Sequence, residues 1–169
     1  MRYILLLIFI AAQSVGLSAQ SSSPFIFSSN ECDFEMEMPI KPSISKDSVF
    51  VQGQYINTTE YRAFESEIIH SVTCSELPAW KNITTKSRTL SILKEVANPK
   101  MNGEIVDLIE IEVDGYFGLK YTETSGITGY NIYNQLLLIE DKLFQMYVSS
   151  LSKDAEERAD EFFNNFNPD

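Results

Sequence analysis

The chain has 169 residues and a formal net charge of −11, from 24 Asp and Glu against 13 Lys and Arg. Nucleic acids and anionic lipid surfaces are bound through basic patches, so this excess of acid excludes both classes of partner. The length fits one domain that is large enough to fold on a hydrophobic core of its own.

The N-terminus has the pattern of a secretory signal peptide. A positive start is followed by the apolar run Tyr3–Ala12 and by a more polar tail that ends in a small residue, Ala19. A membrane span needs roughly 20 apolar residues, and this shorter run favours a cleaved signal over an uncleaved anchor. We therefore expect residues 1–19 to be removed. The rest, without a transmembrane span, is expected in the periplasm or outside the cell, with a bacterial source.

The exported chain is expected to hold a flexible, Ser-rich arm over 20–31 and a single domain over 32–166. Alternating or β-branched apolar residues predict its strands. They are Cys32–Met38, Asp47–Ile56, Tyr61–Leu77, Glu104–Val113, Tyr116–Glu123, Tyr130–Ile139 and Lys142–Ser149. A turn is predicted at Asn57–Glu60. The apolar residues of Tyr61–Leu77 also fit helical spacing, so a partly helical segment stays open there.

Two helices are predicted from apolar residues at helical spacing. The first covers Thr84–Ala97, and the second starts after Ser152 and carries an apolar stripe that ends at Phe166. Leu136–Ile139 is apolar on both faces, which is typical of a central strand with both faces covered. The predicted fold class is therefore α+β: an antiparallel β-sheet flanked by helices on both faces, as an α/β/α sandwich.

Four short motifs carry a family resemblance. They are a strand that ends in proline at Phe34–Pro39, the turn Val113–Gly118, the hairpin ending Leu143–Ser150 and the final helix ending Glu161–Phe166. Together they resemble the PsbP-like, or Mog-like, α/β/α sandwich domains, which include small exported bacterial proteins of the DcrB type. The resemblance implies that fold and a non-catalytic role, because the members are mostly binding or accessory proteins, some of them attached to photosynthetic complexes.

Two cysteines follow the signal peptide, and an even number in an exported protein favours a disulfide. A bridge between Cys32 and Cys74 would close a loop of about 40 residues and add about 3–4 kcal/mol of stability in the chain-entropy model. Two unpaired, buried thiols are the alternative, and the sequence leaves both open. With a single histidine and no paired CxxC, the two cysteines do not make a structural zinc site.

The sequence offers little for catalysis. His70 is the only histidine, and on a strand it lies too far from Cys74 for a direct hydrogen bond. No GxSxG elbow and no glycine-rich phosphate loop occur. We therefore predict no catalytic, cofactor-binding or metal-binding residues.

Two groups of side chains have both a structural and a functional interpretation. Asp33, Glu35 and Glu37 share one face of the first strand, where a spacing of roughly 6.6 Å favours a solvated face over a cation site. Aromatic residues gather in the C-terminal half and either pack in the sheet or form an exposed binding face. They are Tyr116, Phe117, Tyr121, Tyr130, Tyr133 and Tyr147.

The predicted function is an exported, non-catalytic accessory or binding protein of the cell envelope, acidic and without a cofactor. Its expected partner is another envelope or secreted protein, and the protein is not expected to be an enzyme. The alternative is a small-molecule or cation binder, or an unrecognised hydrolase, that uses acidic and tyrosine residues. The identity of the partner and the oligomeric state stay open.

Overall fold

The structure is a computed structural model that describes residues 24–51, 54–77, 80, 83, 85–97, 103–124, 129–151 and 155–168. The predicted signal peptide lies outside the described residues. The strands are β1 (Phe25–Ser29), β2 (Phe34–Met38), β3 (Ser43–Val51), β4 (Gln54–Glu65), β5 (Ile68–Glu76), β6 (Glu104–Val113), β7 (Tyr116–Thr124), β8 (Asn131–Ile139), β9 (Lys142–Ser150) and β10 (Asn167–Pro168), and the helices are α1 (Lys86–Val96) and α2 (Ala155–Asn164).

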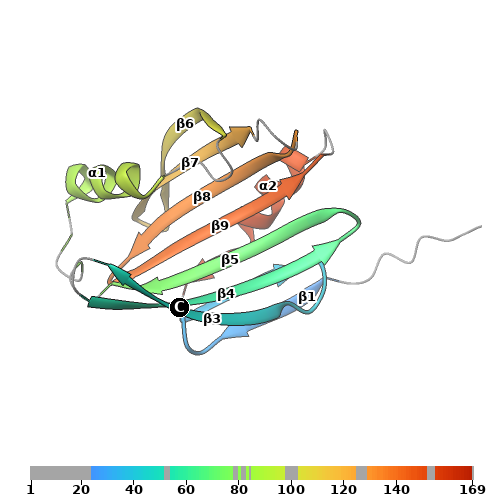
Figure 1. Cartoon of the computed structure of the whole chain (residues 1–169), viewed down its shortest axis with the longest axis horizontal. Coiled ribbons are helices and arrows are strands. Elements are labelled where there is room, and N and C mark those ends of the chain that lie inside the picture. The colour runs from blue at the N-terminus through green and yellow to red at the C-terminus, as the bar shows by residue number, and fades with distance from the viewer. Residues whose placement is uncertain are drawn as a thin grey trace, which may run out of the picture.

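Seven strands form one antiparallel sheet in the order β3-β4-β5-β9-β8-β7-β6 (Figure 1). All but one of the neighbouring pairs join strands that follow each other in the chain. The exception is β5 with β9, where Val72 lies opposite Met146 and Cys74 lies opposite Phe144. This pairing joins the N-terminal strands to the C-terminal strands in the middle of the sheet.

Strand β8 is the central strand that the sequence predicts. Its residues are buried from Ile132 to Ile139. Leu137 and Ile139 belong to one hydrophobic core, whereas Leu136 and Leu138 belong to the core on the other face of the sheet. A turn at residues 140–141 then joins β8 to β9 in an antiparallel hairpin. Both the central position and the hairpin are confirmed.

A second sheet of three strands, in the order β1-β2-β10, covers one face of the large sheet together with α2. Phe27 of β1 lies 4.9 Å from Tyr61 of β4, measured between ring centroids. The arm expected over 20–31 is therefore wrong for Phe25–Ser29, which pairs with the whole of β2. Phe27 anchors this strand through its ring contacts with Phe34 and Tyr61, although serines near the short apolar run hide it in the composition.

The other face carries a smaller core beneath α1. Leu90 and Leu93 of the helix pack with Leu119, Leu136 and Leu138 of strands β7 and β8. The two helices are close to their predicted positions, and the α2 residues Ala155, Ala159, Phe162 and Phe163 form the expected buried stripe. Neither described helix combines the length and apolarity that crossing a bilayer requires.

The predicted fold class is wrong. The described chain is mostly β, with ten strands in two sheets and two helices of only 11 and 10 residues. A second sheet shares the α2 face, and α1 lies mainly over β7 and β8 on the other face. The expectation failed because the apolar strand β1 lies within a Ser-rich segment, so one of the two covering layers was not recognised.

Strand boundaries near the N-terminus also differ from the prediction. Asn57–Glu60 is not a turn but the middle of β4, where it pairs with β3 on one side and, from Thr58 on, with β5 on the other. The actual turn is at Ser66 and Glu67, whose φ angles are 49° and 69°. Residues other than Gly, Asn and Asp rarely adopt this left-handed conformation, so the usual hairpin signal is missing. Tyr61–Leu77 is thus two strands and not partly helical.

Candidate functional site

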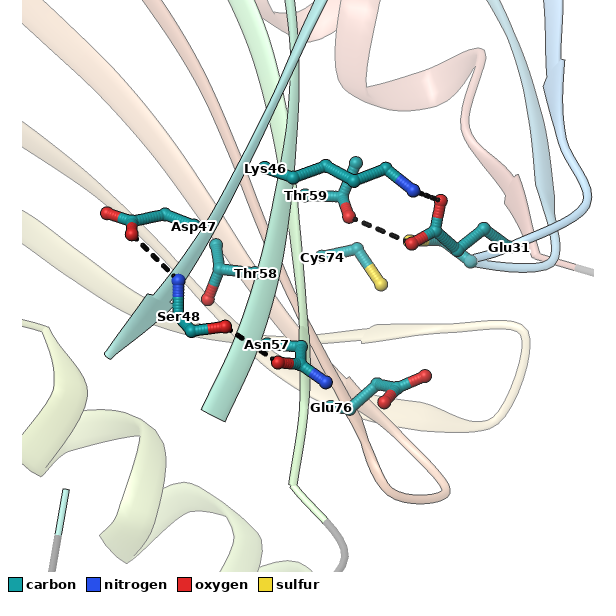
Figure 2. Close-up of a pocket in the computed structure, with 10 residues that line it drawn as sticks. Glu31, Lys46, Asp47, Ser48, Asn57, Thr58, Thr59, Cys74 and Glu76 are labelled. Carbon is teal, nitrogen blue, oxygen red and sulfur yellow. Dashed lines mark hydrogen bonds and ion pairs between the residues drawn. The ribbon is translucent and has the colours of Figure 1, made fainter. Parts of the chain in front are cut away.

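A polar pocket of about 540 Å³ lies where the turn before β2 meets strands β3, β4 and β5 (Figure 2). Strand register brings its lining together, since Lys46 lies opposite Thr59 and Thr59 lies opposite Cys74. The turn before β2 adds Glu31 and Cys32. The full lining is Glu31, Cys32, Lys46, Asp47, Ser48, Asn57, Thr58, Thr59, Cys74 and Glu76.

Hydrogen bonds fix the polar wall of the pocket. Lys46 Nζ donates to Glu31 Oε2 at 2.6 Å, and Thr59 Oγ1 donates to Glu31 Oε1 at 3.3 Å. The hydrogen bond from Lys46 holds the pKa of the Glu31 carboxyl below its usual value. On the other side, Ser48 Oγ donates to Asn57 Oδ1 at 2.8 Å. Three carboxylates and one ammonium line the pocket, which gives it a negative formal charge.

The two cysteines meet at this pocket. Cys32 and Cys74 are each 2% exposed, and both are free thiols in the structure. A hydrogen bond from the Cys74 thiol lowers the pKa of Cys32, and the Tyr61 hydroxyl, 3.7 Å from Cys32 Sγ, acts in the same direction. The same contact with Cys32, together with burial, raises the pKa of Cys74. Figure 2 shows the Cys74 sulfur among the polar side chains of the pocket.

His70 lies elsewhere. Its ring packs edge-on against Phe162 at 5.2 Å, and burial, with a further contribution from the charge of Arg158, lowers the pKa of His70 to about 4. The histidine is four residues from Cys74 on β5, which is about 13 Å along an extended strand. It also lines a different pocket from the thiols. The structure therefore places no imidazole base beside either cysteine.

The acids of β2 lie on a solvated face, as the spacing favours. Phe34, Met36 and Met38 point into the core, and Glu35 and Glu37 between them are exposed. Among the described residues, no group of three or more His, Cys, Asp and Glu side chains is placed to hold a metal ion.

Most of the aromatic residues pack into the sheet. Tyr121, Tyr133 and Tyr147 are buried, and Tyr116 and Phe117 are partly buried against the two cores. The sequence did not identify Tyr61, Lys46 and Glu31 as partners of the cysteines. No local pattern marks them, because cross-strand register and the β1–β2 turn bring them together.

A second candidate surface is the β6 edge, the outer side of strand β6, which has no neighbouring strand beyond it among the described residues. Val106, Leu108 and Ile109 are 39%, 38% and 52% exposed there. A bulge between Val106 and Ile109, with Asp107 at a φ of 55°, turns part of the strand outward. The exposed acids of this strand are Glu104, Asp107, Glu110 and Glu112.

The large antiparallel sheet with its three-stranded companion and two short helices is a PsbP-like fold. The solution structure of cyanobacterial PsbP (CyanoP) from Synechocystis sp. PCC 6803 matches it with a TM-score of 0.56 and 18% identity, over 94% of this chain and 99% of that one. The crystal structure of a Pseudomonas aeruginosa protein of unknown function gives a TM-score of 0.41 and 10% identity, over 85% and 93% of the two chains.

No family model matches the sequence, and no curated protein matches it. At 18% identity, the likeness to CyanoP shows the fold alone. The PsbP part of the predicted resemblance is therefore confirmed at the level of the fold. The DcrB and Mog parts remain predictions.

Proposed function

We propose that this chain is an exported, non-catalytic accessory protein that binds another protein of the cell envelope, with the β6 edge as the binding surface. The observation that carries the proposal is found on one sheet edge, where Val106, Leu108 and Ile109 are exposed and no strand of the described part of the chain pairs with the outer backbone. A strand edge of this kind accepts a further strand from a partner through main-chain hydrogen bonds. Most native edges are protected against such pairing.

Charge defines the chemistry of the partner. Of the four exposed acids on β6, Glu110 has a local partner, because Lys94 of α1 lies 2.9 Å from it. The remaining acids and the net charge of −11 favour a basic segment. The segment that fits best is therefore extended, with basic residues alternating with apolar ones. The straight part of the edge after the bulge, Ile109–Val113, would offer it a regular register.

The non-catalytic part of the proposal rests on the fold. The structure has a PsbP-like fold, and the resemblance to PsbP-like domains implies binding or accessory roles.

A photo-crosslinking amino acid in place of Ile109 tests the proposed surface. Ile44 is the matched control, because it is 56% exposed and lies on β3, the opposite edge of the same sheet. We expect a defined crosslinked envelope protein from position 109 and none from position 44. An excess of unlabelled protein should compete, whereas an excess of the Ile109→Lys variant should not. No crosslink at position 109, or the same products at both positions, would refute the β6 edge as the binding surface.

Export needs a separate measurement. The mature protein isolated from its native cells should begin at Gln20 and be found outside the cytoplasm. An intact N-terminus on cytoplasmic protein would contradict export without bearing on the β6 edge.

A further inference from the structure

We propose that Cys32 and Cys74 form a redox-active pair, which a small, positively charged disulfide oxidises through the polar pocket. This site is independent of the β6 edge, which lies at the other end of the large sheet from β3 and β4. The ligand class follows from the lining, where Glu31, Asp47 and Glu76 outnumber the single Lys46.

Several contacts hold the two sulfur atoms together. Glu31, the residue before Cys32, accepts a hydrogen bond from Thr59, and Thr59 is the cross-strand partner of Cys74. The Tyr61 hydroxyl, from the same face of β4, contacts Cys32 Sγ at 3.7 Å. The backbone N–H of Cys32 donates to Ser29 Oγ at 3.2 Å, which fixes the turn itself. The thiols thus meet in a framework that does not depend on a bond between them.

The surroundings of the two thiols differ, which sets the order of events. Cys32 receives hydrogen bonds from Cys74 and Tyr61, and both lower its pKa and favour its thiolate. The pKa of Cys74 is raised, so this residue stays protonated until its neighbour has reacted. Because the thiolate is the nucleophile in exchange, Cys32 attacks first and Cys74 resolves.

The chemistry balances with the disulfide as the oxidant. The Cys32 thiolate attacks one sulfur of the small disulfide, forms a mixed disulfide and releases the first thiolate. Cys74 then loses its proton to solvent and attacks Cys32 Sγ, which forms the protein disulfide and releases the second thiolate. The two cysteines lose two electrons and two protons in total, and the small disulfide gains both as two thiols.

The negative charge of the pocket lining should make the rate of oxidation depend on the charge of the disulfide. Charges within a pocket concentrate a ligand of opposite sign, and added salt screens the effect. Reduced protein should therefore react faster with cystamine, which is cationic, than with uncharged hydroxyethyl disulfide or anionic oxidised glutathione. We expect a rate difference of roughly tenfold between cystamine and glutathione at low salt, and a smaller one in the double variant D47N/E76Q.

Intact-mass measurement on the purified protein follows the reaction. Reduced wild-type protein treated with cystamine should lose two hydrogens and keep no adduct. The Cys74→Ser variant should accumulate a cystamine adduct on Cys32, and Cys32→Ser should react at least roughly tenfold more slowly than Cys74→Ser. Serine is the matched replacement, because its hydroxyl can still accept the hydrogen bond from Tyr61.

The proposal would be overturned by a folded wild-type protein that forms no bridge, by equal rates for the two serine variants, or by rates that do not depend on the charge of the disulfide. If a serine variant fails to fold, peptide mapping of the early mixed disulfide in wild-type protein identifies the first thiol. The thiol–disulfide exchange rate can be followed in urea as a further test. A rate that rises in parallel with global unfolding would show that the thiols react in the unfolded chain and not through the pocket.

Discussion

Replacing Phe34 with alanine should destabilise the protein by about 3–5 kcal/mol, because the substitution opens a cavity where the two sheets meet. Phe34 is fully buried, with 0% exposure. Its ring lies 5.4 to 5.9 Å from those of Phe27, Tyr61, Phe144 and Phe166, measured between centroids. Each aromatic contact adds about 0.5–1.5 kcal/mol to the free energy gained by burying apolar surface. The loss of stability should therefore lie in the upper part of the range of about 3–5 kcal/mol.

Urea unfolding measures this free energy, with Trp80 fluorescence and far-ultraviolet circular dichroism as two probes. Trp80 is the single tryptophan and packs against the α1 core, on the opposite face of the large sheet from Phe34. A domain that unfolds as one unit gives the same loss with both probes. The matched control is Phe64→Ala on β4, where the ring is 61% exposed and the loss should stay below about 1 kcal/mol. A loss for Phe34→Ala no larger than that of the control would refute the packing argument.

Three further predictions concern stability. The pKa of His70 is lowered to about 4 from 6.5, so the unfolded chain binds a proton at this residue before the folded protein does as the pH falls. The free energy of unfolding should therefore drop by about 2 kcal/mol between about pH 8 and pH 5. Urea titrations of His70→Gln should show a smaller drop over the same pH range. A bridge from Cys32 to Cys74 should raise the free energy of unfolding by about 4 kcal/mol. The bridged protein should then have a higher urea midpoint than the reduced protein, and equal midpoints would contradict this prediction. Gly118→Ala should cost at least about 2 kcal/mol, because its Cβ would lie 2.5 Å from the backbone oxygen of Leu136. Gly115→Ala is the control, because its added Cβ would lie in open space and would cost only the strain of a φ of +85°, about 1 kcal/mol. A thermal melt in which Gly115→Ala is the less stable of the two variants would contradict the steric argument.

Local periodicity was enough to predict the C-terminal half of the fold. Strand β8 is apolar on both faces and is followed by a turn, so its central position and its hairpin with β9 follow from the residues themselves. The apolar stripe of α2 was equally clear, since Ala155, Ala159, Phe162 and Phe163 repeat at helical spacing.

The N-terminal half could not be predicted in the same way, because its structure depends on contacts between distant residues. Asn57, Thr58 and Thr59 have the composition of a turn, yet strands on both sides hold them in the middle of β4. Tertiary pairing overrode their local preference. The pocket was missed for this reason, since three of its lining residues were assigned to a loop.

The cysteine pair falls between these cases. Their number and the expected export suggested a disulfide, but sequence spacing alone does not bring Cys32 near Cys74. The pairing of β4 with β5 and the turn before β2 place them together. The structure thereby supplies the proximity that the composition could only suggest.

The short strand β10 has a consequence for how the chain matures. Asn167 lies opposite Glu35, and Phe166 completes the ring cluster around Phe34. The three-stranded sheet therefore draws on residues from both ends of the domain. A polypeptide that is synthesised from its N-terminus makes β2 long before β10, so the apolar face of β2 stays exposed until the C-terminal residues follow. A segment fused directly after Pro168 is therefore expected to disturb the final closing step of this sheet.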